Sequence, residues 1–161
     1  MPVQVGDRIP SVNVKIAAES GGGEEISTEA LFAKKKAVLF AVPGAFTPTC
    51  SAKHVPGFVQ HIDALKAKGV DLVACISVND AFVMGAWGRD QGVAGKLTML
   101  ADGNGDFTRA MGLVLDGKGF GMGERSQRYA AILEDGVIKA LEVEAPGKFE
   151  VSSAEAILAK L

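Results

Sequence analysis

Residues 37–50 have the sequence AVLFAVPGAFTPTC, an unbroken apolar run followed by a turn and a cysteine. Six apolar residues in succession, from Ala37 to Val42, are typical of a central strand that is covered on both faces of a sheet. Thr47 and Pro48 come shortly before Cys50, and a threonine followed by a proline is a favourable start for a helix. We therefore predict a strand, a short turn and a helix, with Cys50 in the first helical turn.

On both sides of this segment, apolar runs alternate with helical patterns. Further strands are predicted at Val12–Ile16, Asp71–Val78, Leu97–Leu100, Tyr129–Leu133 and Val137–Val143. Helices are predicted at Thr28–Ala33, Pro48–Lys68, Asp80–Gln91, Asp106–Met111 and Ser153–Leu161. The last two strands flank Glu134-Asp135-Gly136, which is a hairpin signal. No repeat or linker divides the chain, so we expect a single α/β domain over residues 1–161, with a mixed central sheet and helices on both faces.

The composition excludes several classes of protein. Of the 161 residues, 48% are hydrophobic and 22% are charged, a balance typical of a globular chain with a real core. The net charge is −2 and the only basic run is at residues 34–36, so nucleic acid is not expected as a partner. No apolar segment is long enough to span a membrane, and the first residues do not have the pattern of a signal peptide. We therefore expect a cytoplasmic protein, in which cysteines stay reduced.

Cys50 is the strongest candidate for chemistry. In the first turn of a helix the backbone N–H groups are unpaired and the helix dipole favours negative charge, so a thiolate is stabilised there. The alternative is a buried cysteine that acts as a small hydrophobic residue. The neighbours Thr47, Pro48 and Thr49 are polar or capping residues, which favours a nucleophile.

Other kinds of site find no support in the sequence. The glycine-rich segment at residues 116–123 does not match the dinucleotide-binding pattern. Two histidines and two cysteines do not form a metal-binding motif. We expect neither a cofactor nor a metal.

Four segments of the chain resemble the peroxiredoxin family. PGAFTPTC at residues 43–50 is similar to the active-site segment of that family, which has a proline, a threonine and the reactive cysteine at these spacings. SAKHVPGF at 51–58, SVNDAFV at 77–83 with Trp87, and RSQRYA at 125–130 resemble the type II, peroxiredoxin-5-like subgroup. The resemblance covers essentially the whole chain and implies a thioredoxin-like fold.

The resemblance also implies roles for four residues. Cys50 attacks a hydroperoxide and becomes a sulfenic acid. Thr47 aligns peroxide and thiolate through hydrogen bonds, and Pro43 shields the pocket from water. Arg128 holds the thiolate and stabilises the charge that develops on the O–O bond. Arg125 competes with Arg128 for this role, but Arg128 fits the motif better.

His54 and Pro56 follow Cys50 in the same predicted helix. His54 is four residues after Cys50, so the two share a helix face and a Cys–His pair is one interpretation. We instead interpret His54 as a supporting or packing residue. Pro56 predicts a kink or break, and hence a weak segment at residues 48–55 that unwinds when Cys50 meets its reductant.

Cys75 lies in an apolar strand run and is interpreted as a buried thiol. The alternative is a resolving cysteine that forms a disulfide with Cys50. Animal members of the subgroup have a further cysteine shortly before the last helix, but residues 148–153 of this chain, KFEVSS, contain none. The resemblance therefore implies a one-cysteine cycle, with Cys50 reduced by glutaredoxin, glutathione or thioredoxin.

Together these features predict a peroxidase that reduces hydrogen peroxide and organic hydroperoxides. By resemblance a homodimer is expected, with the helix start at Asp80–Trp87 at the interface. A peroxide sensor that passes oxidation to a bound protein is a second hypothesis. A thioredoxin-fold interaction module is a third, but it gives no reason for Thr47, Cys50 and Arg128 to occur together.

Overall fold

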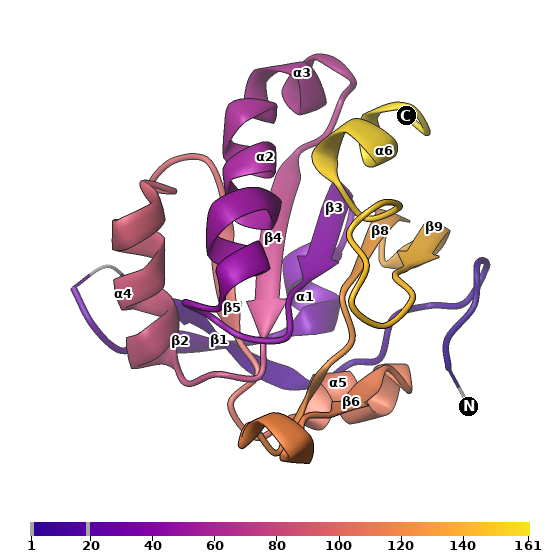
Figure 1. Ribbon diagram of the computed structural model, residues 1–161. Helices are drawn as coiled ribbons and strands as arrows, with labels where there is room; N and C mark the ends of the chain where they lie inside the picture. The colour runs from indigo at the N-terminus through magenta and orange to yellow at the C-terminus, as the bar shows by residue number, and fades with distance from the viewer. Residues whose placement is uncertain (1, 19) are drawn as a thin grey trace.

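Seven strands form one mixed sheet at the centre of the molecule (Figure 1). The computed structural model describes residues 2–18 and 20–161. The strand order is β2-β1-β5-β4-β3-β8-β9; β3, β4 and β5 are parallel, and the other neighbours are antiparallel. The strands of this sheet are β1 (Asn13–Ala17), β2 (Gly23–Ser27), β3 (Lys36–Ala41), β4 (Leu72–Ser77), β5 (Thr98–Ala101), β8 (Tyr129–Glu134) and β9 (Val137–Val143). A separate antiparallel pair consists of β6 (Val114–Asp116) and β7 (Glu124–Ser126).

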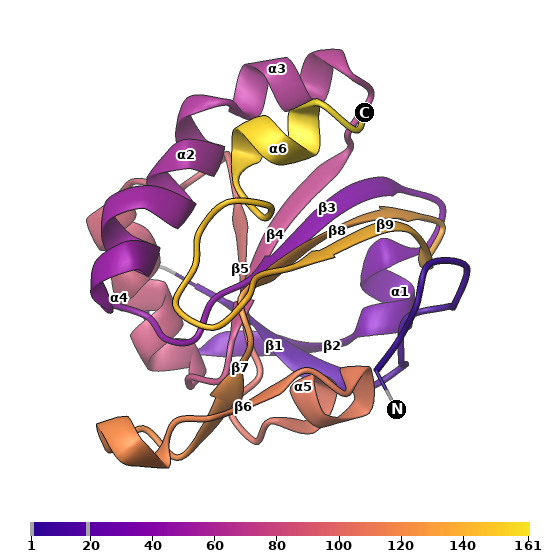
Figure 2. The same cartoon turned by 45° about the vertical axis from the view of Figure 1, so that its right-hand side comes forward.

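Helices cover both faces of the sheet, as Figures 1 and 2 show. One face carries the π-helical turn η1 (Cys50–His54), α2 (Val55–Gln60), α3 (Ile62–Ala67), α4 (Ala81–Gln91) and α6 (Ala154–Leu158). The other face carries α1 (Thr28–Phe32) and α5 (Asp106–Met111), and the 3₁₀ turn η2 (Lys118–Phe120) lies between β6 and β7. None of the helices in the described residues is long and apolar enough to cross a bilayer. The expectation of a mixed α/β sheet with helices on both faces is confirmed.

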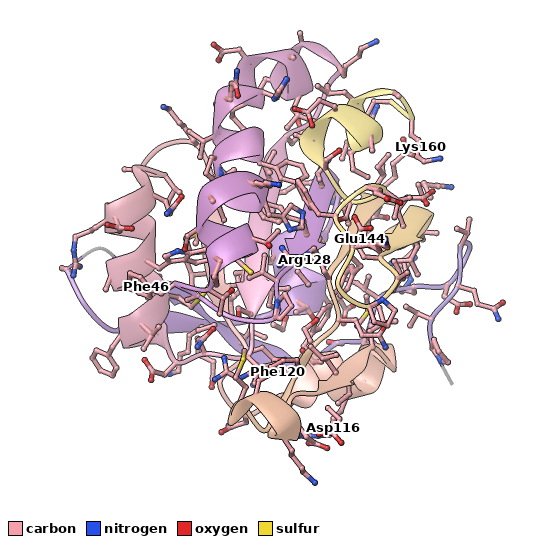
Figure 3. The ribbon with its side chains drawn as sticks, viewed as in Figure 1. Phe46, Asp116, Phe120, Arg128, Glu144 and Lys160 are labelled. Carbon is pink, nitrogen blue, oxygen red and sulfur yellow. The ribbon has the colours of Figure 1, made fainter. Side chains whose placement is uncertain are left out.

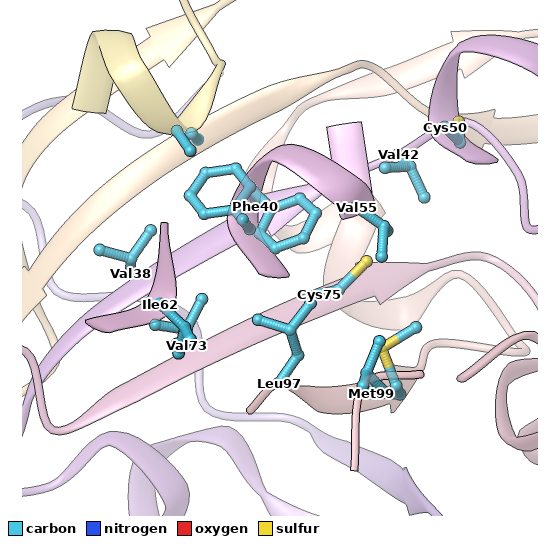
Figure 4. Close-up of a cluster of buried hydrophobic side chains, with 14 of the residues drawn as sticks. Val38, Phe40, Val42, Cys50, Val55, Ile62, Val73, Cys75, Leu97 and Met99 are labelled. Atoms are coloured by element: carbon cyan, nitrogen blue, oxygen red, sulfur yellow. The ribbon is translucent and has the colours of Figure 1, made fainter. Parts of the chain in front are cut away.

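Strand β3 explains why the apolar run at residues 37–42 is unbroken. Side chains of a strand alternate between the two faces of a sheet. Val38, Phe40 and Val42 lie in the cluster under α2 and α4, while Leu39 and its neighbours Ala37 and Ala41 lie in the cluster under α1 and α5. Figure 4 shows the first of these clusters, where Phe40 stacks on Phe58 with ring centroids 4.1 Å apart. Both faces need apolar side chains, so no polar residue interrupts the run.

Three strands were absent from the sequence prediction. β2 has the sequence GEEIS and lies at the edge of the sheet, where charged side chains reach solvent. β6 and β7 have three residues each, which is too short for a periodic pattern to appear. The six predicted strands are confirmed with boundary shifts of a few residues, and Asp135 and Gly136 form the predicted two-residue hairpin turn, both with positive φ.

The helix predicted at Pro48–Lys68 is interrupted in two places. Residues 50–54 form a π-helical turn in which the N–H of Val55 donates to the carbonyl of Cys50, five residues earlier. Pro56 follows in the first turn of α2. A proline is tolerated there because the N–H that it lacks would have no partner within that helix. A second irregularity at His61 separates α2 from α3. The kink or break expected at Pro56 therefore takes the form of a wide turn directly after Cys50.

Candidate active site

The turn after β3 places Cys50 at the start of a helix. Residues 48 and 49 are helical, and the N–H of Ser51 donates to the carbonyl of Thr47 at 2.9 Å, the first bond of the helix. Thr47 is therefore the N-cap residue, as its sequence position predicted. The Cys50 side chain is fully buried and not bridged to another cysteine. Directly behind it, the indole Nε1 of Trp87 donates to the hydroxyl of Ser51 at 2.9 Å and ties α4 to this turn.

The Thr47 hydroxyl faces the sulfur. Its Oγ1 lies 2.9 Å from Cys50 Sγ and 2.7 Å from the carbonyl oxygen of Gly44. A hydroxyl has one proton to donate and can also accept. With a Cys50 thiolate it donates to the sulfur; with a thiol it accepts from S–H and donates to Gly44. Thr47 thus fits both protonation states of Cys50.

Arg128 provides the second polar contact to Cys50. It comes directly before β8, and its Nη2 lies 3.1 Å from Cys50 Sγ while Nη1 lies 2.8 Å from His54 Nδ1. The guanidinium also lies 5.9 Å from the centre of the Phe149 ring, within the range of a cation–π contact. Arg128 therefore places a fixed positive charge beside the buried sulfur.

His54 orients Arg128 and does not reach the sulfur as a base. Its Nε2 lies 2.9 Å from the carbonyl oxygen of Ser152, and a carbonyl can only accept, so Nε2 carries the hydrogen. Nδ1 is then free to accept from Arg128. Burial, followed by the charge of Arg128, lowers the pKa of His54 to about 3, although the bond to Ser152 opposes this. The ring therefore stays neutral, and this geometry favours the supporting role over a Cys–His pair.

The loop between β3 and the helix is held by polar contacts. Ala45 donates its N–H to Asn79 Oδ1 at 3.0 Å, and Ser77 donates to the same oxygen at 2.6 Å. Phe46 has φ of 65°, a left-handed conformation that a non-glycine residue adopts at a cost. Its side chain is exposed, with the ring centre 6.4 Å from that of Trp87. The turn that carries Thr47 is thus strained and fixed in place by the end of β4.

A pocket of about 300 Å³ opens beside this group. Its lining includes Pro43, Thr49 and Arg128, and Arg128 also contacts Cys50 Sγ. The apolar part of the lining comes from Val114, Leu115, Ala145 and Pro146. The pocket can accept a small molecule with an apolar part.

Three of the four predicted site residues meet at Cys50 Sγ, and the fourth, Pro43, lines the pocket next to them. Arg125 lies apart: its Nε donates to the carbonyl of Met122, and its guanidinium packs against Gly44. The described residues contain no group of three or more His, Cys, Asp or Glu side chains placed to hold a metal ion.

Sequence reasoning missed Glu144, Ser152 and Asn79, which support the site from three other segments. Asn79 lies in the SVNDAFV segment, so a signal existed there. The Glu144 carboxylate binds backbone N–H groups, and Ser152 contacts His54 through its backbone carbonyl. Side-chain types alone give no signal of such contacts.

Comparison with known proteins agrees with this geometry. The family model described as Redoxin matches residues 4–158. The chain is 50% identical over 162 residues to Peroxiredoxin-2E, chloroplastic, of Arabidopsis thaliana, covering 99% of this chain and 69% of that protein. The structure of reduced Prx3 in complex with H₂O₂ from Vibrio vulnificus has a TM-score of 0.92 and 53% identity, covering 99% of both chains. Peroxiredoxin 5 from Alvinella pompejana has a TM-score of 0.87 and 37% identity, covering 98% of this chain and 97% of that one. The chain therefore belongs to the peroxiredoxins, in the type II, peroxiredoxin-5-like subgroup, and is a thiol-dependent peroxidase with a thioredoxin-like fold.

Proposed function

We propose that Cys50 is the peroxidatic nucleophile, with Thr47, Arg128 and Pro43 as the other site residues. The observation that carries this is the position of Cys50 Sγ between Thr47 Oγ1 at 2.9 Å and Arg128 Nη2 at 3.1 Å. The thiolate attacks the terminal oxygen of a hydroperoxide, the O–O bond breaks, and the leaving alkoxide or hydroxide takes a proton. The sulfur is oxidised to a sulfenic acid and the peroxide is reduced to an alcohol or water.

Arg128 and Thr47 act on the Cys50 sulfur and on the leaving oxygen of the peroxide. As the O–O bond breaks, negative charge passes from the sulfur to the leaving oxygen. A cationic donor and a hydroxyl already aimed at the sulfur are well placed to follow that charge without reorganising. Pro43 forms the pocket wall next to them and limits the access of water.

The pocket beside Pro43 suits the organic part of a larger hydroperoxide. Val114, Leu115 and Pro146 present apolar surface there, and its volume of about 300 Å³ fits a small organic group. A bulkier side chain at Val114, as in Val114→Trp, is expected to slow the reaction with cumene hydroperoxide and to leave that with hydrogen peroxide nearly unchanged. Equal effects on both substrates would reject this use of the pocket.

The cycle is proposed to use one cysteine of the chain. The sulfenic acid of Cys50 condenses with an external thiol, which releases water and forms a mixed disulfide, and a second thiol then restores the Cys50 thiolate. Cys75 is poorly suited to replace the external thiol. It lies in the middle of the sheet, paired with Phe40 of β3 on one side and Met99 of β5 on the other. Glutaredoxin, glutathione and thioredoxin are the candidate reductants.

A fully buried sulfur cannot meet another protein without a local opening. The segment at residues 48–55 contains the wide π-helical turn and is followed by Pro56, so fewer regular helical bonds resist its unwinding. We propose that this segment opens after oxidation. Hydrogen exchange of residues 48–55 is expected to be faster in the oxidised protein; equal protection in both states would count against the opening.

A homodimer is proposed through the surface around the start of α4. Phe82 in the first turn of α4 is 69% exposed, and Phe46 in the neighbouring loop is 53% exposed. Exposed aromatic side chains are typical of interfaces. Phe82→Lys is expected to convert a dimer to a monomer in analytical ultracentrifugation, and a wild-type protein that is monomeric at micromolar concentration would reject the dimer.

A cytoplasmic location and a single domain over residues 1–161 remain proposals. The two free thiols suit a reducing compartment, and one sheet carries both apolar clusters. Fractionation of cells would test the location, and a chloroplast location, as in the name of the Arabidopsis relative, would overturn it.

For a single domain, the thermal unfolding transitions followed by near-UV and by far-UV circular dichroism are expected to coincide.

The experiment that tests the cycle is a panel of reductants applied to the wild type and to Cys75→Ser. Peroxide consumption is measured with thioredoxin, with glutaredoxin plus glutathione, and with glutathione alone. Turnover by both proteins with at least one external thiol is the expected result. Loss of turnover in Cys75→Ser alone would replace the one-cysteine cycle by an internal disulfide.

A further inference from the structure

Glu144, the residue that follows β9, has a buried carboxylate that holds one loop in place. Its Oε2 accepts hydrogen bonds from the N–H groups of Glu150 at 2.8 Å, Val151 at 2.9 Å and Ser152 at 2.8 Å. The hydroxyl of Ser152 donates to the same oxygen at 2.7 Å. Four donors converge on one oxygen of a side chain that is 7% exposed. Such a convergence requires a strong, charged acceptor.

The charge state of Glu144 agrees with this arrangement. Burial raises the pKa of its carboxyl, but the hydrogen bonds from Ser152, Glu150 and Val151 outweigh burial and bring the pKa below its usual value. The carboxylate is therefore ionised at neutral pH.

Two routes connect Glu144 to Arg128. Through the backbone, the N–H of Glu144 donates to the carbonyl of Arg128 at 2.9 Å. Through side chains, the carbonyl of the Ser152 that Glu144 holds accepts from His54 Nε2 at 2.9 Å, and His54 Nδ1 accepts from Arg128 Nη1 at 2.8 Å. Figure 3 shows Arg128 and Glu144 close together, between the helix after Cys50 and the loop that leads to α6. The chain of contacts ends at Cys50, 3.1 Å from Arg128 Nη2.

We propose that Glu144 is a positioning residue for the peroxidase reaction, acting through Ser152 and His54 on Arg128. This inference rests on the proposed roles of Cys50 and Arg128. When a neutral amide replaces the carboxylate, three backbone N–H groups and one hydroxyl lose their charged acceptor, and the Ser152 carbonyl moves. His54 then loses the bond that selects its tautomer, and Arg128 loses a fixed acceptor on one arm of its fork. The other arm is no longer aimed at the sulfur.

The test compares Glu144→Gln with a matched control, Glu142→Gln. Glu142 is two residues earlier in the chain and pairs with Lys160 at 3.0 Å, away from Arg128. Ser152→Ala is a milder variant, because it removes one of the four donors but keeps the carbonyl that holds His54. All are made in a Cys75→Ser background, so that Cys50 is the only thiol.

Two rates are measured for each protein. The first is the second-order rate constant of the reduced protein with hydrogen peroxide, which needs a positioned Arg128. The second is the alkylation of Cys50 by iodoacetamide at a pH above the usual pKa of a thiol, which needs an accessible thiolate but no guanidinium aimed at the sulfur. A general loosening of the structure would speed alkylation, since Cys50 is buried. A misplaced Arg128 slows only the reaction with peroxide.

For Glu144→Gln the expected result is a peroxide rate about tenfold lower, with alkylation within about twofold of the parent. Glu142→Gln should match the parent in both rates, and Ser152→Ala should lie between the two variants. A peroxide rate unchanged in Glu144→Gln would overturn the role of Glu144, and so would a slower peroxide reaction accompanied by faster alkylation. A parent protein that does not react with peroxide would instead refute the proposed function.

Discussion

Cys50 and Cys75 are both fully buried and lie in the same apolar cluster, yet their surroundings differ. Cys50 has a hydroxyl and a guanidinium within hydrogen-bonding distance. Cys75 lies on β4 among apolar side chains, as Figure 4 shows, and burial raises the pKa of its thiol well above the usual value. Burial alone therefore does not make a cysteine reactive or inert. Polar donors aimed at the sulfur make that difference.

The largest effect is expected from Cys50→Ser. Peroxide turnover should fall by at least about a thousandfold, because a serine hydroxyl is not an ionised nucleophile at neutral pH. Stability should change little, since Thr47 and Arg128 can hydrogen-bond a hydroxyl. Stopped-flow peroxide consumption and thermal unfolding measure the two quantities. Appreciable turnover in this variant would move the reactive site away from Cys50.

The next largest effect on the peroxide rate constant is expected from changing the Arg128 guanidinium. Arg128→Lys keeps the positive charge but cannot bond His54 and Cys50 at the same time, so the peroxide rate constant should fall about a hundredfold. Arg125→Lys is the matched control and should remain within about threefold of the wild type, because Arg125 bonds to Met122 and packs on Gly44. An equal loss in both variants would show that the two arginines share the role.

Two variants of Thr47 separate the effect of its hydroxyl from the effect of its side-chain shape. Thr47→Val removes the donor to Cys50 and should slow the peroxide reaction about tenfold or more, since the hydroxyl follows the charge in the transition state. Thr47→Ser keeps the hydroxyl and should retain most of the rate. Rapid-quench kinetics with dimedone trapping of the sulfenic acid would measure both. If valine and serine behaved alike, the hydroxyl would have no part in the chemistry.

His54 predicts a pH dependence of stability. Its pKa is about 3 in the folded protein and 6.5 in the unfolded chain, so between these values the unfolded state binds one more proton. The free energy of unfolding should therefore fall by about 1.4 kcal/mol per pH unit as the pH drops below 6.5. Above pH 6.5 the ring is neutral in both states, so His54 does not change the free energy of unfolding there.

His54→Gln should flatten this slope between pH 6.5 and 5, as measured by urea unfolding. His61→Gln is the control and should keep it, because this change leaves the buried His54 in place. A slope that survives in His54→Gln would assign the proton uptake to another group.

The smallest effect on activity is expected for Cys75→Ser. The pattern is the reverse of that for Cys50→Ser, with activity kept and stability lowered. The peroxide rate constant should stay within about twofold. Stability should fall by about 1–3 kcal/mol, because the new hydroxyl is buried in apolar surroundings. Urea unfolding and stopped-flow kinetics measure the two effects. A large loss of activity without loss of stability would make Cys75 part of the site.

Much of the sheet was predictable from local patterns. The continuous run at residues 37–42 and the Asp135-Gly136 turn each lead to one structure, because both faces of β3 need apolar side chains and the turn needs positive φ at both positions. Charged β2 and the three-residue strands β6 and β7 carry no comparable signal. They form because the strand next to them in the chain offers backbone hydrogen bonds, β1 to β2 and β6 to β7, and backbone groups leave no trace in the side-chain pattern.

The proposed nucleophile and its local setting could be predicted from the sequence alone. Thr47, Pro48 and Cys50 are close along the chain, and capping rules act over that distance. The motif resemblance also predicted Arg128 and Pro43, but only the fold shows what holds the arginine in place. Arg128 is 78 residues from Cys50, and the Glu144 carboxylate reaches it through the backbone of Ser152 and the ring of His54. Backbone carbonyls and N–H groups occur at almost every residue, so only the folded chain selects which of them hold the arginine.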